Sequence, residues 1–500
     1  MIRRRLRVAF GILCLWGLPA AASAQQSAPE PIEFSGPLLD RTHWAVEAVE
    51  RLRALGEVDE HLPPQNSVPL EEVERALRAA AGAGTGALPP AGAWHARLLE
   101  EFSGVGVVHS ASGRVPVVLT GRATAGVRWR EGGVAPGRGE FEPERTGALP
   151  LDDQTRWVGV GETALAWGSH LGLSARLESD EDGVRFDRLE VAVGWGRVRA
   201  SVGRTPVGYA HGRGGGVLLG GDAALDAIQL GTREPFRLPF FLRVLGPVSV
   251  HTFLGRMWED RHPGDPYFWG GSAYLQPHPR ITFGIHRAAL FGGKEDDPVT
   301  VKKVLGMLVG RVASHGFEDQ IVSVSGRFDL PTEEVLPLTA YLEWGSEDAA
   351  GAWHDVPGIV GGLWSPSLPF APGVAMGAEY AHFSTSCCGN PKWYRHWSFV
   401  GSWASRDLPL GHPLGGNGRQ AMVFAEAYLL DARARLGGSV YRRDRKDENL
   451  FAPGREGGST GGSFSLEVRP FPSWELRLEA AEERGDDWSD RNVRIEVSYF

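Results

Sequence analysis

The pattern in this chain that most resembles a catalytic motif is a glycine–serine run, Gly457-Gly458-Ser459-Thr460-Gly461. Its spacing matches a nucleophile elbow, which requires a sharp turn from a strand into a helix. We place the run in a glycine-rich loop, where Ser459 would lack that turn. No histidine pair has the spacing of a zinc-binding helix. The sequence therefore predicts a protein that is not an enzyme and that needs neither a metal nor a cofactor.

Two aromatic groups with nearby charges are better suited to holding sugars. Aromatic rings cover the apolar faces of sugar rings, and Arg or His pairs with the carboxylates of uronate or pyruvate groups. The candidate polysaccharide-binding residues are Trp258, Tyr267, Trp269, Trp393, Tyr394, Arg395, His396, Arg406 and His412. The alternative is that the aromatic residues form the interfacial girdle of a membrane protein. The sequence leaves both interpretations open.

The second aromatic group begins the stretch around which we interpret the rest of the chain, residues 394–418. Aromatic and polar residues alternate from His396 to Trp403, and this period of two predicts a β-strand. Glycine, proline and asparagine then predict a long turn that keeps Arg406, Asp407 and His412 in water. A strand with one aromatic face that opens into a large polar loop is the repeating unit of an outer-membrane barrel.

The same alternation recurs along the chain as far as Phe500. Leu171 and Leu173, for example, alternate with Ser174 and Arg176. The apolar face would meet lipid and the charged face a wet lumen. We therefore predict an all-β fold, a transmembrane antiparallel β-barrel of roughly 16 to 18 strands over residues 104–500. A large soluble β-protein is the alternative. The long polar segments are predicted to be mostly extracellular loops, some of which could fold into the lumen. They are residues 209–226, 258–269, 345–358, 384–396, 405–420 and 442–462.

Residues 1–24 have the pattern of a signal peptide: four arginines, a short apolar run and the cleavage site Ala22-Ser23-Ala24. Its removal takes four positive charges from a chain whose formal net charge is −9. An acidic exported protein of this kind has no basic surface for nucleic acid. Only the adjacent Cys387 and Cys388 then remain, and they could close at most a strained local ring.

Residues 25–103 are predicted to form a helical periplasmic segment. Trp44, Leu52 and Leu55 have helical spacing, a second helix follows Pro69, and a third carries Trp94 and Leu98. Each apolar stripe needs a partner, so the helices should pack on one another or on the barrel mouth. This segment also resembles an S-layer homology repeat, a binder of cell-wall polymer, although Leu70 stands where that motif has arginine.

The motifs taken in order resemble the capsule assembly Wzi family of outer-membrane proteins. The matching segments are residues 203–219, 234–236, 245–255, 283–293, 341–344 and 411–415. The resemblance implies a monomeric barrel in outer-membrane lipid, with a periplasmic helical part, that retains capsular or other exported polysaccharide at the cell surface. The alternative function is an outer-membrane porin or uptake channel with a wall-binding helical prefix.

Overall fold

The computed structural model describes most of the chain from Leu38 to Phe500. The described residues are 38–41, 43–58, 67–83, 91–102, 105–110, 113–132, 155–167, 170–180, 183–209, 211–220, 224–257, 262–294, 298–308, 317–332, 335–347, 357–384, 393–396, 398–399, 403–405, 408–430, 432–447, 449–451 and 454–500. The predicted signal peptide, Cys387 and Cys388, Trp258 and Arg406 lie outside these ranges.

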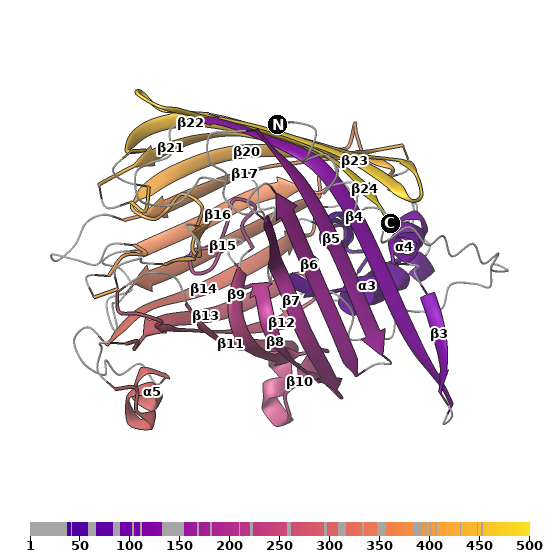
Figure 1. Cartoon of the computed structure of the whole chain (residues 1–500), viewed down its shortest axis with the longest axis horizontal. Helices are drawn as coiled ribbons and strands as arrows, with labels where there is room; N and C mark the ends of the chain where they lie inside the picture. Colours follow the sequence, from indigo (N-terminus) through magenta and orange to yellow (C-terminus); the bar gives the residue numbers. More distant parts are fainter. Residues whose placement is uncertain are drawn as a thin grey trace. The chain divides into compact units, whose positions relative to one another are not determined.

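Among the described residues, 18 antiparallel strands form a closed wall (Figure 1). The wall strands are β4 (Gly113–Gly132), β5 (Thr155–Trp167), β6 (Leu171–Asp180), β7 (Gly183–Trp195), β8 (Val198–Pro206), β9 (Ala224–Thr232), β11 (Pro247–Arg256), β12 (Tyr267–His278), β13 (Ile281–Phe291), β14 (Glu318–Leu330), β15 (Leu338–Glu347), β16 (Pro357–Ser365), β17 (Val374–Phe383), β20 (Gly418–Leu429), β21 (Ala434–Arg445), β22 (Gly457–Phe471), β23 (Trp474–Arg484) and β24 (Ser489–Tyr499). The ring closes where β24 pairs with β4, from Asp490 opposite Gly132 to Tyr499 opposite Ala123. The barrel predicted from the alternating pattern is therefore confirmed.

Successive side chains along each wall strand point alternately outward and into the lumen. Outward side chains such as Trp157, Ile285 and Leu476 are apolar and exposed, as lipid requires. Inward side chains are largely charged, and they are paired: Arg128 donates to Glu178 at 2.9 Å and to Glu496 at 3.5 Å. Because an unpaired charge is costly away from water, this pairing lets the inward face be both charged and buried.

The connections differ sharply between the two ends of the barrel. At the end that we call the short-turn end, hairpins such as Trp195-Gly196-Arg197-Val198 join β7 to β8, with Gly196 at φ 56°. At the opposite end, the long-loop end, most connections are longer, and two of them carry α5 (Val301–Leu308) and the pair β18 (Ala404–Ser405) and β19 (Leu408–Pro409). Two further strands extend the sheet: β3 (Val105–Ser110) along β4, and β10 (Phe236–Arg237) along β11, before the short helix η1 (Phe240–Leu245).

Three helices lie at the short-turn end, namely α2 (Trp44–Ala54), α3 (Leu70–Ala83) and α4 (Ala91–Glu101), with a small ladder of β1 (Leu38–Asp40) and β2 (Ser67–Pro69). Their apolar stripes share one core with Tyr428 of β20. Arg51 of α2 donates to the carbonyl oxygens of Pro366 (2.7 Å) and Gly373 (3.2 Å) in the β16–β17 turn. The helices thus pack both on one another and on the wall. Within the described ranges, none of the helices is long and apolar enough to cross a membrane.

Two local predictions were wrong. In the described part of residues 396–403 there is no strand, and the backbone turns instead of extending. The run Gly457–Gly461 is not a loop, because it begins β22 and pairs with β21. Its Ser459 is buried and donates to Glu483 at 2.6 Å, so this serine belongs to an ion-pair network of the wall.

Candidate functional site

At the long-loop end, two segments fold into the lumen. We call them the lumen plug: the described parts of residues 207–220 and 393–417. Its apolar side chains, including Val217, Tyr394 and Trp403, share one core with inward wall residues such as Phe253 and Phe383. The sequence allowed that some loops fold into the lumen, and these two do. Burial of large aromatic side chains is a strong driving force for this packing.

Two wall carboxylates bind the backbone of the first plug segment. Glu379 accepts hydrogen bonds from the backbone N–H groups of Arg213 (2.6 Å) and Gly214 (2.9 Å). Glu343 accepts from the N–H groups of Val217 (3.0 Å) and Leu218 (3.3 Å). Charged acceptors give strong hydrogen bonds to backbone donors. The glycine-rich segment is therefore fixed to β15 and β17 through its main chain.

Glycine is required where this segment approaches the wall most closely. A Cβ atom on Gly212 would lie 2.2 Å from the carbonyl oxygen of Gly215 and 2.9 Å from Glu379. Gly215 itself adopts φ 138°, a conformation that residues with side chains rarely adopt. Gly212 and Gly215, which lie in one of the segments that resemble the family, thus allow backbone amides to reach the carboxylates.

Arg213 connects the plug to the helical segment at the other end of the lumen. Its guanidinium donates to Glu47 of α2 and to Glu426 of β20, both at 3.3 Å, and it lies over the Trp364 ring. Burial lowers the pKa of Arg213, but Glu426 and Glu47 raise it more, so this pKa is above its usual range. Arg213 therefore remains a cation that joins plug, helix and wall.

The second plug segment places three predicted binding residues in the core. Trp393, Tyr394 and His412 are all fully buried. Tyr394 has φ 67°, and its backbone N–H donates to Glu347 at 2.9 Å. The prediction that the turn keeps His412 in water was wrong, because its Nδ1 accepts from the backbone N–H of Leu414 at 3.0 Å inside the plug. In this arrangement none of the three is open to a polymer.

Arg395 and His396 lie at the edge of the plug and are half-buried. Arg395 donates to the carbonyl oxygen of Asn449 at 2.7 Å. Burial lowers the pKa of His396 to about 4, so at neutral pH this imidazole is uncharged. It can donate or accept a hydrogen bond from a sugar, but it would not be a cation for a carboxylate.

Tyr267 and Trp269 lie on the lipid-facing side of β12, in a region predicted to be a loop. They pack with Ala289 and Phe291 of β13. This position corresponds to the interfacial girdle, one of the two interpretations that the sequence left open. Trp258 and Arg406 lie outside the described residues, so their roles remain predictions.

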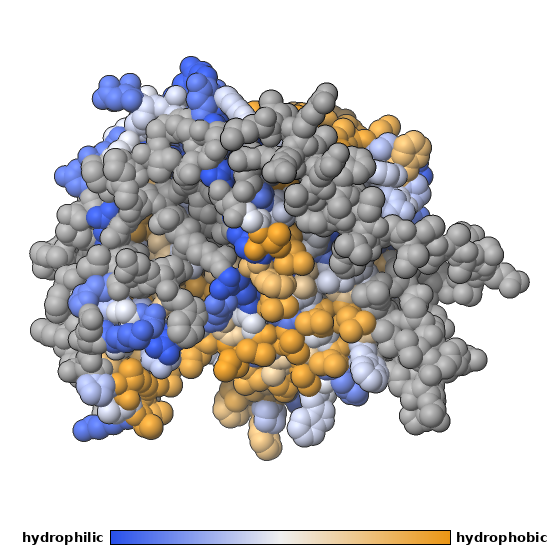
Figure 2. Space-filling model, in the orientation of Figure 1, coloured by the Kyte–Doolittle hydropathy of each residue, from blue (hydrophilic) through white to orange (hydrophobic). Residues whose placement is uncertain are grey.

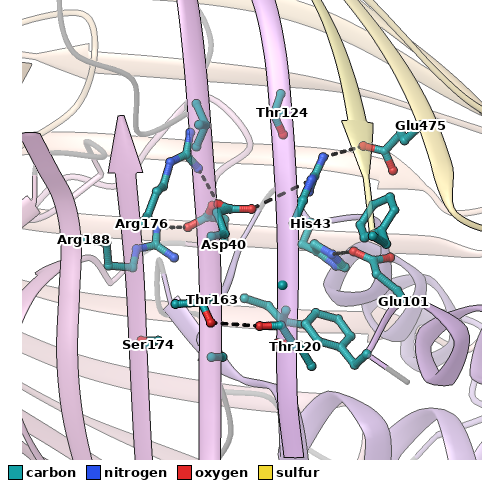
Figure 3. A pocket seen from close by; sticks show the side chains of 18 of the residues that line it. Asp40, His43, Glu101, Thr120, Thr124, Thr163, Ser174, Arg176, Arg188 and Glu475 are labelled. Carbon is teal, nitrogen blue, oxygen red and sulfur yellow. Dashed lines mark hydrogen bonds and ion pairs between the residues drawn. The ribbon is translucent and has the colours of Figure 1, made fainter. Parts of the chain in front are cut away.

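A cavity of about 150 Å³ lies at the other end of the lumen, between the helical segment and the wall (Figure 3). Arg122 donates to Glu475 at 2.7 Å, and His43 pairs with Glu101 at 3.0 Å. Asp40 faces Arg188; burial alone would raise the pKa of Asp40, but the charges of Arg188 and Arg176 hold it below its usual range. Of these pairs, the one between Arg188 of β7 and Asp40 of β1 joins the helical segment to the wall. The sequence analysis did not identify these hydrogen-bond donors and acceptors, either here or in the plug. Most of them are the inward-facing polar residues of the alternating wall strands.

A closed antiparallel sheet, apolar outside and charged inside, defines an outer-membrane β-barrel, and here both ends of the lumen carry packed segments. The family model described as capsule assembly protein Wzi matches residues 120–492. The chain belongs to this family, as the ordered motifs predicted, and is an outer-membrane protein. No curated protein matches the chain.

Several solved structures are similar to this chain over most of its length. One describes Wzi as an outer membrane protein involved in group 1 capsule assembly in Escherichia coli and as a carbohydrate-binding β-barrel. It is 15% identical, with a TM-score of 0.71, and the match covers 92% of this chain and 99% of that one. OpdL of Pseudomonas aeruginosa is 12% identical with a TM-score of 0.46, covering 77% and 98% of the two chains. OccK5 (OpdH) of the same organism is 12% identical with a TM-score of 0.48, covering 77% and 97%.

Proposed function

We propose that this protein retains capsular or another exported polysaccharide at the cell surface, through the long-loop end of the barrel and without chemical change to the polymer. The observation that carries the proposal is the lumen plug, in which Glu343 and Glu379 hold backbone amides across the lumen. Segments packed inside the lumen favour a binding surface over an open passage. Membership in a capsule assembly family, and the carbohydrate binding stated for the Escherichia coli Wzi structure, support the same function.

Among the predicted residues, Arg395 and His396 are the described ones that a surface polymer could reach. Their partial exposure at the edge of the plug leaves a guanidinium and a neutral imidazole beside the solvent. Arg pairs well with sugar carboxylates, and a neutral imidazole suits hydroxyl groups. Trp258 and Arg406 complete the proposed surface as predictions from the sequence.

The competing function is a channel, which needs an open lumen whose charged lining sets ion selectivity. Planar-bilayer recording and a polysaccharide-binding assay on the same detergent-purified protein separate the two. We expect polymer binding with little steady conductance. Large steady conductance without polymer binding would establish the channel instead.

The non-catalytic part of the proposal has its own test. Ser459 donates to a wall carboxylate and so is not placed as a nucleophile, and the described residues include no group of three or more metal-binding side chains. Polysaccharide incubated with the protein should keep its chain length in size-exclusion chromatography. Reproducible shortening of the polymer would overturn this conclusion.

A further inference from the structure

The helix α5 lies outside the barrel, against the lipid-facing side of the wall. Its buried Met307 shares a cluster with Ala289 and Phe291 of β13. On the same face of β13, Phe283 and Ile285 are exposed to the surroundings of the barrel. Figure 1 shows α5 projecting from the wall on the side of β11 and β13. The helix therefore occupies the border between the lipid-facing wall and the long-loop end.

The orientation of α5 is fixed by a wall residue. Arg287 of β13 donates to the carbonyl oxygens of Met307 (2.6 Å) and Leu308 (3.1 Å). These carbonyls lie in the last turn of the helix, where a cation is favourable both as a hydrogen-bond donor and for the helix dipole. One face of α5 is thus held on the wall and the other must face away from it.

The face that points away from the wall is apolar. Val301 is 78% exposed and Leu305 56% exposed, and the exposed Lys302 lies beside them. Such a short helix, with apolar residues on its outer side and lysines at its edge, is typical of interfacial segments. Their apolar side chains enter the acyl region while the lysine ammonium groups reach the headgroups.

A second apolar projection occurs at the short-turn end of the same part of the wall. In η1, Phe240 is 84%, Phe241 82% and Val244 73% exposed, and none of its residues is buried. It leads directly into β11, whose outward Val250 and Leu254 are also exposed and apolar. Figures 1 and 2 show η1 projecting below the wall, within an apolar area of this face. Exposed apolar surface of this kind marks a binding surface.

We propose that α5 and η1 are lipid-binding segments that insert their apolar side chains into the two leaflets of the outer membrane, at the two borders of the β11–β13 wall. The occupant is lipid because both projections continue a wall surface that already faces lipid. With the long-loop end outward, α5 lies in the outer leaflet and η1 in the inner leaflet. The proposal requires the outer-membrane location and does not depend on polysaccharide binding.

The test attaches an environment-sensitive fluorophore at Leu305→Cys and at Phe241→Cys in a chain carrying Cys387→Ser and Cys388→Ser. Proteins are placed in phospholipid nanodiscs after heat-modifiable gel mobility has shown that they are folded. Ile285→Cys, on the lipid-facing wall, is the lipid control, and Asp486→Cys, in the exposed β23–β24 turn, is the water control. Val301→Cys and Val244→Cys serve as second positions if either variant fails to fold.

We expect brominated phosphatidylcholine to quench both test positions as strongly as it quenches Ile285→Cys, because their side chains lie among acyl chains. Iodide should quench both positions much less than it quenches Asp486→Cys. Quenching by iodide as strong as at Asp486→Cys would overturn the proposal. Protection from both quenchers would also overturn it, because it would mean that protein, and not lipid, covers the segment.

Discussion

The hydroxyl of Tyr394 donates a hydrogen bond of 2.5 Å to the carbonyl oxygen of Val217, and so joins the two segments of the lumen plug. The phenol oxygen of Tyr394 also accepts a hydrogen bond from the backbone N–H of His412 at 2.9 Å. One buried phenol therefore holds backbone groups from positions that are far apart in sequence. Burial raises the pKa of Tyr394, so the hydroxyl keeps its proton and remains a donor.

Replacing Tyr394 with Phe should loosen the plug. The change removes the partner of a buried carbonyl and of a buried N–H, at about 1–3 kcal/mol for each group left unsatisfied. We expect a lower free energy of unfolding in urea and more frequent open events in planar bilayers. Tyr380→Phe is the matched control, because Tyr380 is exposed on the outside of the wall and its loss should change neither quantity.

Replacing Glu343 and Glu379 with Gln should release the glycine-rich segment. Each carboxylate uses its two oxygens for two backbone N–H groups, and an amide offers only one acceptor oxygen. Conductance should rise several-fold in the double variant, since each lost charged acceptor costs about 1–3 kcal/mol. Glu482→Gln alters an exposed ion pair and should leave conductance low. An equally low conductance in the double variant would show that the carboxylates do not hold the plug.

Acid should weaken the attachment of the helical segment through Glu50. Burial alone would raise its pKa, but Arg327, Arg53 and Arg41 lower it from 4.5 to about 2. A lowered carboxyl pKa stabilises the folded state above pH 4.5, and this stability is lost as pH falls from 4.5 towards 2. The shift corresponds to at most about 3 kcal/mol. Thermal unfolding followed against pH should show this loss in the native chain and not in Glu50→Gln.

Arg395→Ala and Trp393→Ala should have different effects. Arg395 is half-buried at the plug edge, so its loss should release polysaccharide from cells while the barrel keeps its thermal stability. Trp393 is fully buried, and its truncation should cost about 3–5 kcal/mol of stability. Parallel measurements of polymer retention and melting temperature test the distinction. If Arg395→Ala cells kept their polymer, Arg395 would not be a binding residue.

Replacing Cys387 and Cys388 with Ser should leave assembly intact. A bond between neighbouring residues closes too small a ring to restrict the unfolded chain much. Heat-modifiable gel mobility of the double variant in outer-membrane fractions provides the measurement. Loss of the folded band would mean that the pair has a structural role.

The wall could be predicted from the sequence because the alternation of apolar and polar residues is local. The types and spacing of Leu171, Leu173, Ser174 and Arg176 assign each to one face of a strand, and the paired strands need not be known. The helices could be predicted for the same reason. Their packing partners could not, because the position of Arg51 beside the β16–β17 turn depends on pairing across the whole sheet.

The candidate site could be predicted only in part. Trp393 and Tyr394 were singled out because aromatic residues gather there, but aromatic residues serve core packing and sugar binding equally well. Burial decides between these roles, and burial is set by the inward fold of the plug. Nor could the local pattern show that Glu343 and Glu379 bind backbone amides, because their partners lie more than a hundred residues away.

Arg213 connects the lumen plug at one end of the barrel with the helical segment at the other end. Its backbone N–H, in the plug, donates to the wall carboxylate Glu379, while its guanidinium donates to Glu47 on α2. A displacement of Arg213 would therefore act on α2 as well as on the wall residues Glu379 and Glu426. This single side chain thus links the two ends of the lumen whatever the conductance of the barrel proves to be.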